Sequence, residues 1–336
     1  MTNKEMRKHG HFIAAALMMA YAMAGMAETK ILYLTAGQSN TDGRVTASEL
    51  PDYLTAPIQK CRISYHSPYD PELAGDFRTF HAASGTKGNA KRWAYDAVVY
   101  YNLAETLDKP FYVVKCSYGG TSIDPAVSCS GRAVARTEDD GTKRTVPFYG
   151  SYAADGTYTQ TYGSGFHWSA DPQFLADTGI AGTIYEKDGR RFTGQSLLKA
   201  WAAAVDAAID SLKANGDDVC VKAIMWHQGE SDKNRVSGRY HDNLKAMVAF
   251  MRQHLAEKLG EGKYLSLPFY CGTVPRASSL YNKVIEDAMY SLEREDRDFH
   301  VIDLRDLTML SDKKHFDGPS AEKFGNRLFK ALQPSN

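Results

Sequence analysis

The chain has 336 residues, and its 40 basic and 40 acidic side chains give a formal net charge of zero. A chain of this length can bury a large core, either as one big domain or as two small ones. No long run of like charge appears, so nothing in the composition indicates a nucleic-acid partner or binding to an anionic membrane surface.

The first residues have the pattern of a secretory signal peptide. Basic residues precede the apolar run FIAAALMMAYAMAGMA, which ends in small residues up to Ala27. A membrane-spanning helix would need a longer and more apolar run. We therefore expect residues 1–27 to be removed as a signal peptide. Residues 28–336 would then be a secreted or periplasmic protein with no membrane attachment.

Five cysteines occur, at positions 61, 116, 129, 220 and 271. Export permits disulfides, and Cys116 with Cys129 would close a short loop, but buried free thiols are at least as good an interpretation. The sequence leaves the pairing open. No Cys or His spacing resembles a structural zinc site, so we expect no metal.

Short β-rich segments alternate with long helical patterns along the chain. The expected strands are Lys30–Gly37, a weaker one near Arg62–Tyr65, Pro110–Ser117, Val221–Gln228, Ser266–Val274 and Phe299–Leu304. The expected helices are Arg92–Leu107, a segment from Leu197 to a stop at Gly216, Tyr240–Leu259, Leu280–Arg294 and Ala321–Leu332. Several strands lack strict alternation, which is typical of strands covered on both faces. The pattern predicts one α/β domain with a mainly parallel sheet between helices.

Residues 124–191 interrupt this alternation and are rich in Gly, Thr, Asp and Tyr. A stretch this long without strong periodicity is usually a functional insertion or a partly ordered segment. Aromatic rings pack against the apolar faces of sugar rings, so Tyr158, Tyr162 and Trp168 are candidates for substrate binding. Packing of the segment onto the body explains them equally well. We expect a single domain with an insertion at about 124–191, not two domains.

Four segments lie at or beyond the carboxyl end of an expected strand or strand-like run. They are GQSN (37–40), SYGGTS (117–122), WHQGESD (226–232) and SDKKHFD (311–317). Ligands bind at this edge of open α/β sheets, so we expect the four segments to converge. Each alone has an ordinary structural explanation, and GQS recurs at 194–196, where it opens a helix. The coincidence of four segments on one edge favours a catalytic site.

Ester hydrolysis requires a nucleophile, a base, a group that orients the base, and donors for the oxyanion. Ser39 is the candidate nucleophile, because Gly37 permits a sharp turn that exposes its hydroxyl. His315 is the candidate base, since a neutral imidazole titrates near working pH. Asp312 lies three residues earlier and can accept a hydrogen bond from the other imidazole nitrogen.

The oxyanion donors and the accessory residues follow from the same segments. The candidate donors are the backbone N–H groups of Ser39 and of Gly119 or Gly120, with the side-chain amide of Gln228 as a further donor. Three roles are open for Glu230: it orients His315, binds a sugar hydroxyl, or holds its loop. We prefer Asp312 as the orienting group. Asp232 and His227 are expected to be structural. Arg44 is either solvated or a contact for a substrate carboxylate.

The blocks GQSN, GGTS and HQGESD, with Asp312-x-x-His315, resemble those of the SGNH-hydrolase superfamily. Within it they are similar to carbohydrate esterases of the sialate O-acetylesterase-like and acetylxylan-esterase type. The resemblance runs from about Lys30 to Leu332 and leaves 124–191 largely unmatched. It implies a flavodoxin-like three-layer α/β/α sandwich and deacetylation of sugars without metal or cofactor. It also implies Ser39 as nucleophile, with Asp312 and His315 as its partners.

Two positions depart from the family pattern. Thr41 stands where members often have methionine, and we expect that position to touch substrate. Gln228 stands where the wider superfamily has an asparagine in the oxyanion hole, a replacement typical of the sugar-esterase branch.

The leading expectation is therefore a secreted serine esterase that removes O-acetyl groups from a carbohydrate, such as an acetylated sialic acid or xylan. One alternative is a lipase-like or thioesterase member of the superfamily, which would favour a broad apolar cleft. Another is a non-catalytic carbohydrate-binding protein, which would not need all three of Ser39, Asp312 and His315. The sequence leaves open the sugar, the acetylated position and the oligomeric state.

Overall fold

The structure is a computed structural model. It describes residues 27–66, 75–82, 92–124, 133–137, 143–147, 150–152, 158–160, 166–175, 184–187, 190–193, 195–214, 216–232 and 239–333. The expected signal peptide lies outside these residues except for Ala27, and Cys129 and Tyr162 also lie outside them.

A seven-stranded sheet with the order β17-β16-β15-β1-β6-β3-β4 forms the centre of the molecule. Its strands are β1 (Thr29–Gly37), β3 (Ile58–His66), β4 (Arg78–Phe80), β6 (Phe111–Ser117), β15 (Asp218–His227), β16 (Phe269–Gly272) and β17 (Phe299–Ile302). All neighbouring strands are parallel except β3 and β4. Counted along the chain, the strands β6-β1-β15-β16-β17 have the order 2-1-3-4-5 of flavodoxin-like folds, which β3 and β4 extend past β6.

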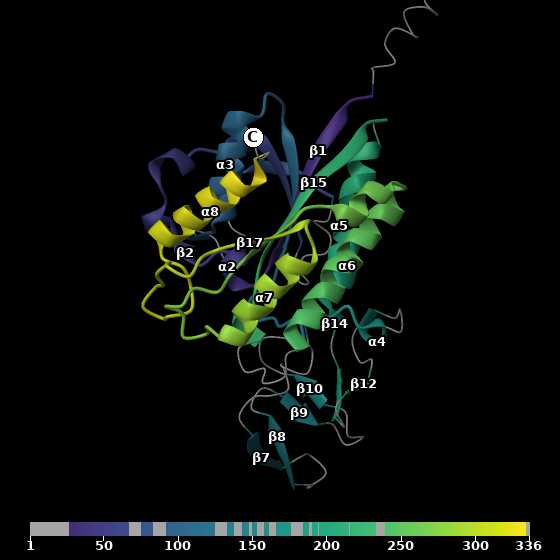
Figure 1. Ribbon diagram of the computed structural model, residues 1–336, viewed down its shortest axis with the longest axis vertical. Helices are drawn as coiled ribbons and strands as arrows, with labels where there is room; N and C mark the ends of the chain where they lie inside the picture. The colour runs from purple at the N-terminus through teal and green to yellow at the C-terminus, as the bar shows by residue number, and fades with distance from the viewer. Residues whose placement is uncertain are drawn as a thin grey trace, which may run out of the picture.

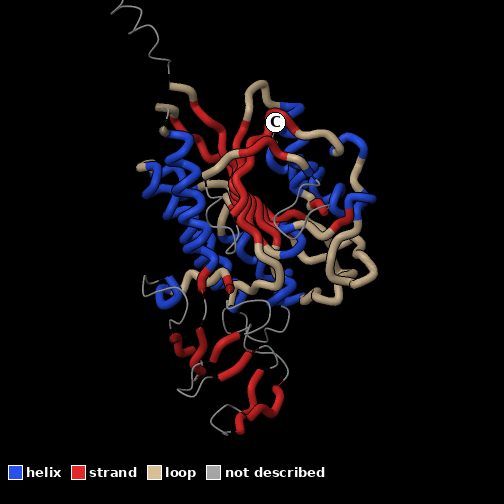
Figure 2. The backbone as a smooth tube through the Cα atoms, turned by 180° about the vertical axis from the view of Figure 1, so that it is seen from behind, coloured by secondary structure: helices blue, strands red, loops and turns tan. Residues whose placement is uncertain are grey.

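Helices cover both faces of this sheet (Figures 1 and 2). One face carries α5 (Leu197–Lys213), α6 (Arg239–Leu259) and α7 (Lys283–Glu295), and the other carries α3 (Asp96–Thr106) and α8 (Gly318–Leu332). Strand β1 contributes side chains to the hydrophobic core on each face of the sheet. Leu32 and Leu34 belong to the core beneath α5, α6 and α7, and Tyr33 belongs to the core beneath α3 and α8. This α/β/α sandwich confirms the expected fold class.

Several element boundaries differ from the sequence-based expectation, and for three of them the structure shows the reason. Strand β15 begins at Asp218 rather than Val221, because its first residues pair with β1 from Thr29 onward. Strand β16 begins only at Phe269, since the preceding residues form the 3-10 helix η7 (Gly262–Ser266), which buries Tyr264. Helix α3 begins at Asp96, because residues 92–93 form a short strand in which Trp93 is buried.

The remaining elements are short. On the body they are α2 (Ser39–Asp42), β2 (Val45–Thr46), η1 (Ala47–Glu49), η2 (Asp52–Leu54), β5 (Arg92–Trp93) and η6 (Glu230–Asp232). Between residues 133 and 196 they are β7 (Ala133–Thr137), β8 (Lys143–Pro147), β9 (Gly150–Tyr152), β10 (Tyr158–Gln160), β11 (Phe166–His167), α4 (Pro172–Leu175), β12 (Ile184–Lys187), β13 (Arg190–Thr193) and β14 (Gln195–Ser196).

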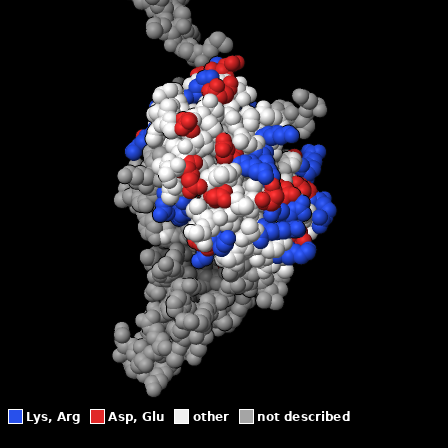
Figure 3. Space-filling model, turned by 90° about the vertical axis from the view of Figure 1, so that its left-hand side faces the viewer, with Lys and Arg blue, Asp and Glu red and all other residues white. Residues whose placement is uncertain are grey.

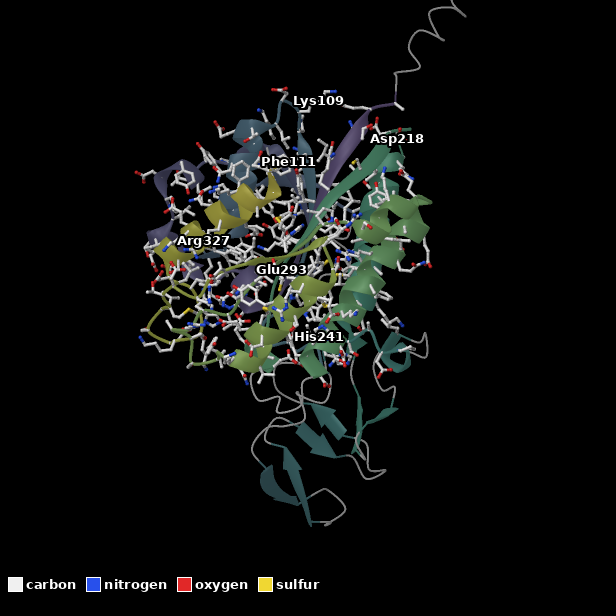
Figure 4. The ribbon with its side chains drawn as sticks, viewed as in Figure 1. Lys109, Phe111, Asp218, His241, Glu293 and Arg327 are labelled. Atoms are coloured by element: carbon white, nitrogen blue, oxygen red, sulfur yellow. The ribbon has the colours of Figure 1, made fainter. Side chains whose placement is uncertain are left out.

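The inserted strands form small sheets of their own, including a four-stranded one with the order β12-β13-β10-β9. They lie beyond the carboxyl ends of the parallel strands (Figure 1). Figure 4 shows the direction: Asp218, which begins β15, lies at one end of the body, and His241 lies at the other end, next to the insertion. The insertion is therefore attached at the edge where the four candidate segments were expected.

Among the described residues, no helix combines the length and apolarity that crossing a membrane requires. The thiols of Cys61, Cys116, Cys220 and Cys271 are free, and burial raises the pKa of Cys116 and Cys271.

Gly37 provides a test of the packing at this edge. Its φ is +148°, and a Cβ there would lie 2.2 Å from the main-chain oxygen of His227. We expect Gly37→Ala to lower the free energy of unfolding by at least about 2 kcal/mol in urea denaturation. Gly262→Ala is the matched control, because a Cβ there meets nothing within 4 Å. Equal losses in the two variants would contradict this account.

Candidate active site

Three of the four candidate segments begin side by side. Gly37 at the end of β1 is in register with His227 of β15 on one side and with Ser117 of β6 on the other. Strand order reverses at β1, so this junction is the switch point at which open α/β sheets bind ligands. The fourth segment lies between β17 and α8 and reaches the same edge through His315, whose ring contacts Ser39.

A single helical turn presents Ser39. The N–H groups of Thr41 and Asp42 donate to the Gln38 oxygen, and the Gln38 N–H donates to the His227 oxygen at 3.1 Å. Thr41 is fully buried beneath this turn, where its hydroxyl shares a hydrogen bond with Tyr95 and donates to the His227 oxygen. The expectation that Thr41 touches substrate is therefore wrong, because its hydroxyl supports the turn from inside.

The side chains of Ser39, His315 and Asp312 form a continuous chain of contacts. Ser39 Oγ lies 3.0 Å from His315 Nε2, and His315 Nδ1 lies 2.6 Å from Asp312 Oδ2. The other carboxylate oxygen of Asp312 accepts from the main-chain N–H groups of Lys314 and His315.

The ionisation of Asp312 determines the proton positions in this chain. Partial burial raises the pKa of Asp312, but hydrogen bonds from the Lys314 and His315 N–H groups and from the imidazole outweigh it and hold the pKa below its ordinary value. An ionised carboxylate only accepts hydrogen bonds, so it keeps a proton on His315 Nδ1. Nε2 is then left to accept from the Ser39 hydroxyl.

The main chain at Gly119 passes beside Ser39. A Cβ built on Gly119 would lie 3.4 Å from the Ser39 Cβ, and the next residue, Gly120, has a φ of +75°. Within the described parts of the chain, the N–H groups of Ser39 and Gly119 have no hydrogen-bond acceptor. Both N–H groups are thus unused among the described residues and belong to main chain at or next to Ser39.

Gln228 does not face this space. It is fully buried, and its Nε2 donates to the Thr121 oxygen at 3.0 Å and to Asp232 Oδ2 at 2.6 Å. Its Oε1 accepts from the Tyr240 hydroxyl. Both amide protons are thus used inside the protein, so the structure does not place Gln228 as an oxyanion donor. The 3-10 helix η6, which follows Gly229, places the Asp232 carboxylate beside the Gln228 side-chain amide.

Asp232 binds the main chain at residues 123–124, where the insertion begins. Its carboxylate accepts from the N–H groups of Ile123 and Asp124 as well as from Gln228. Burial nevertheless raises its pKa to about 7, against the lowering effect of these hydrogen bonds. The expected structural role of Asp232 agrees with these contacts.

Glu230 contacts neighbours other than the imidazole of His315. It is 1% exposed, and its Oε1 accepts from Asn40 Nδ2 at 2.8 Å and lies 3.5 Å from His227 Nδ1. His227 is fully buried, and burial lowers its pKa while Glu230 opposes that effect. Asn40 was not among the expected site residues, although its place directly after Ser39 in the GQSN segment was a usable signal.

The candidate sugar-binding residues have different positions. Arg44 Nη1 donates to Asp42 and to the Gly43 oxygen, and its Nη2 would be 2.8 Å from a Cβ on Gly119, so Arg44 lies beside the site. Trp168 is 1% exposed and packs edge-to-face on Trp226, so of its two interpretations the structure favours packing onto the body. For Tyr158 the structure describes only the backbone, in β10, and Tyr162 lies outside the described residues.

No group of three or more His, Cys, Asp or Glu side chains in the described ranges is placed to hold a metal ion. A separate open hollow lies beyond β17, and charged residues contribute to its lining. Its charges are paired, Arg305 with Asp303 and Arg327 with Asp306. The face shown in Figure 3 accordingly mixes basic and acidic side chains.

Comparisons with known proteins identify a matching family and two structures of similar fold. Residues 191–334 match the family described as carbohydrate esterase, sialic acid-specific acetylesterase. An Arabidopsis thaliana protein of known structure is 15% identical with a TM-score of 0.56, and the alignment covers 90% of this chain and 97% of that one. The structure of NanS is 12% identical with a TM-score of 0.52, covering 91% and 98%. No curated protein matches the chain.

At these identities, the two structures establish the fold alone. The family match includes His227, Gln228, Glu230, Asp312 and His315, and it begins after Ser39. It identifies a carboxylic ester hydrolase. More particularly, it confirms the resemblance to sialate O-acetylesterase-like carbohydrate esterases that the sequence motifs indicated.

The raised pKa of Asp232 predicts a pH-dependent stability. The folded state holds the proton more tightly than the unfolded chain, whose ordinary pKa is 3.8. The stabilising effect of that proton is present below this value and is lost as pH rises towards about 7. We expect the stability of the parent relative to Asp232→Asn to fall across this range in urea denaturation. A difference that does not change with pH would contradict the assignment.

Proposed function

We propose that this protein is a serine esterase that removes O-acetyl groups from carbohydrates, with Ser39 as nucleophile, His315 as general base and Asp312 as the residue that orients the base. The contact of Ser39 Oγ with His315 Nε2 at 3.0 Å, beside two unused N–H groups, is the observation that carries the proposal. These are the groups that acyl transfer requires in this geometry.

The proposed reaction has two halves. Ser39 Oγ attacks the acetyl carbonyl while Nε2 of His315 takes the hydroxyl proton, and the N–H groups of Ser39 and Gly119 stabilise the oxyanion. The C–O bond to the sugar then breaks, and His315 gives the proton to the leaving sugar oxygen. Water, deprotonated by His315, then attacks the acetyl-serine, the bond from the acetyl carbon to Ser39 Oγ breaks, and His315 returns the proton to Ser39 Oγ as acetate leaves. The negative charge of Asp312 stabilises the imidazolium formed in each half.

The substrate is proposed to be an acetylated carbohydrate, because the matched family is described as sialic acid-specific acetylesterase. Arg44, whose guanidinium lies beside Gly119, is proposed to contact the sugar portion. Secretion after removal of residues 1–27 is likewise proposed, and the basic and apolar pattern of those residues supports it.

Acetate release tests the function directly. The mature protein is incubated with acetylated xylo-oligosaccharides, acetylated sialic acids and a synthetic acetyl ester. We expect release from at least one of them and a loss of more than about 10³-fold in Ser39→Ala, because the nucleophile is removed. No release from any member would contradict the proposal, as would an undiminished rate in the variant.

A second test compares the effects of substituting Asp312 and Glu230 on turnover. Asp312→Asn reverses the hydrogen bond to His315 and favours the wrong tautomer, for which we expect a loss of about 10⁴-fold in kcat. Glu230→Gln keeps an oxygen that can accept from Asn40, so its kcat should fall less. Steady-state kinetics on the synthetic ester compare the two. The reverse order would refute Asp312 as the orienting residue.

A further inference from the structure

The side chain of Asn40 contacts the residues on both sides of His315. Its Nδ2 donates to the Lys314 oxygen at 3.2 Å, and its Oδ1 accepts from the Phe316 N–H at 3.1 Å. Asn40 is 4% exposed and directly follows Ser39 in the same helical turn. One carboxamide therefore links the segment of the general base to the turn that presents the nucleophile.

Glu230 adds a third contact to this carboxamide. Asn40 Nδ2 also donates to Glu230 Oε1 at 2.8 Å, within a buried pair. The Lys314 oxygen can only accept and the Phe316 N–H can only donate, so these groups select the amide orientation that also directs Nδ2 towards Glu230. Oδ1 is then directed to the Phe316 N–H. If the amide were reversed, Oδ1 would face the carboxylate and the Lys314 oxygen, and both contacts would be repulsive.

The end of β15 determines where Glu230 lies. It begins the 3-10 turn η6 immediately after β15, and it lies 3.5 Å from Nδ1 of the fully buried His227. The main-chain oxygen of His227 accepts from the Gln38 N–H beneath Ser39. The carboxylate thus belongs to the same rigid edge as the nucleophile turn, whereas His315 lies on a loop and Asp312 is partly exposed.

We propose that Asn40 and Glu230 are positioning residues that hold the His315 loop against the nucleophile turn and so set the distance between Ser39 Oγ and His315 Nε2. This inference rests on the proposed function of the same site. In this proposal Glu230 neither orients the His315 imidazole directly nor binds the substrate. Because an error of about 1 Å in such a distance costs on the order of 10²-fold in rate, the pair has a measurable effect on catalysis.

The proposal makes the effect of Asn40 depend on His315. We would measure the rate at which a fluorophosphonate reagent phosphonylates Ser39 with loss of fluoride, in the parent, Asn40→Ala, His315→Ala and the double variant. Asn40→Ala is expected to slow labelling on the order of 10²-fold. In the His315→Ala background the same substitution should change the rate by less than about threefold, since there is no base left to position.

Two further variants distinguish the proposed effect from a general loss of folding. Glu230→Gln is the conservative change, and it should show the same dependence on His315 with a smaller loss. Asn102→Ala is the matched control, because this exposed carboxamide bonds to Asn326 away from the site. Labelling in that variant should equal that of the parent. If both Asn40→Ala and Glu230→Gln lower the rate equally with and without His315, the proposal is overturned.

An NMR measurement separates this proposal from the proposed function. The ring resonances of His315, assigned by their loss in His315→Ala, report the position of the imidazole whether or not Ser39 reacts. We expect them to shift or broaden in Asn40→Ala and to stay unchanged in Asn102→Ala. Absence of labelling in the parent would contradict the serine-esterase function, whereas unchanged His315 resonances in Asn40→Ala would contradict the positioning role.

Discussion

The close approach of β1 and β15 at their carboxyl ends is the constraint on which the site depends. Gly37 lies so near the His227 carbonyl that no side chain fits between them, and the Gln38 N–H donates to that same carbonyl. The chain leaves β1 in a turn whose first residue is Ser39. Every other group of the site is held relative to this junction, either through main-chain register or through a buried polar side chain.

Residues 228–232, which follow β15, connect this junction to two other segments of the site. Gln228 and Asp232 hold Thr121 and the start of the insertion, and so fix the loop that carries Gly119. Glu230, between them in sequence, holds Asn40 and through it the loop of His315. A buried polar network is costly unless its members are bonded, and in return it specifies a single geometry. The motif HQGESD thus contacts both the segment after Gly119 and, through Asn40, the loop of His315.

Much of this arrangement could be predicted from the sequence. The strand and helix patterns give the sandwich, and parallel strands must bring GQSN, SYGGTS and WHQGESD to one edge. The Asp-x-x-His spacing allows the carboxylate to reach the imidazole, and the structure shows that contact. These features depend on periodicity and short spacings, which a single sequence records.

Side-chain direction could not be predicted in the same way. Gln228 was expected to face an oxyanion, but its amide donates inside the protein to the Asp232 carboxylate and to the Thr121 oxygen, which lies 107 residues away in the chain. Substrate binding and packing onto the body were both open for Trp168, and it packs against Trp226, a contact between residues far apart in the chain. Thr41 is buried, and its hydroxyl shares a hydrogen bond with the hydroxyl of Tyr95, which lies 54 residues further along the chain. Each outcome depends on long-range packing.

The central claim is that Ser39 carries the acyl group during turnover. The most direct measurement is peptide mass mapping of the protein after acid quenching during reaction with an activated acetyl ester. The account predicts an acetyl group on the peptide that contains Ser39, localised to its hydroxyl. Turnover with the acetyl group on a different side chain would contradict it.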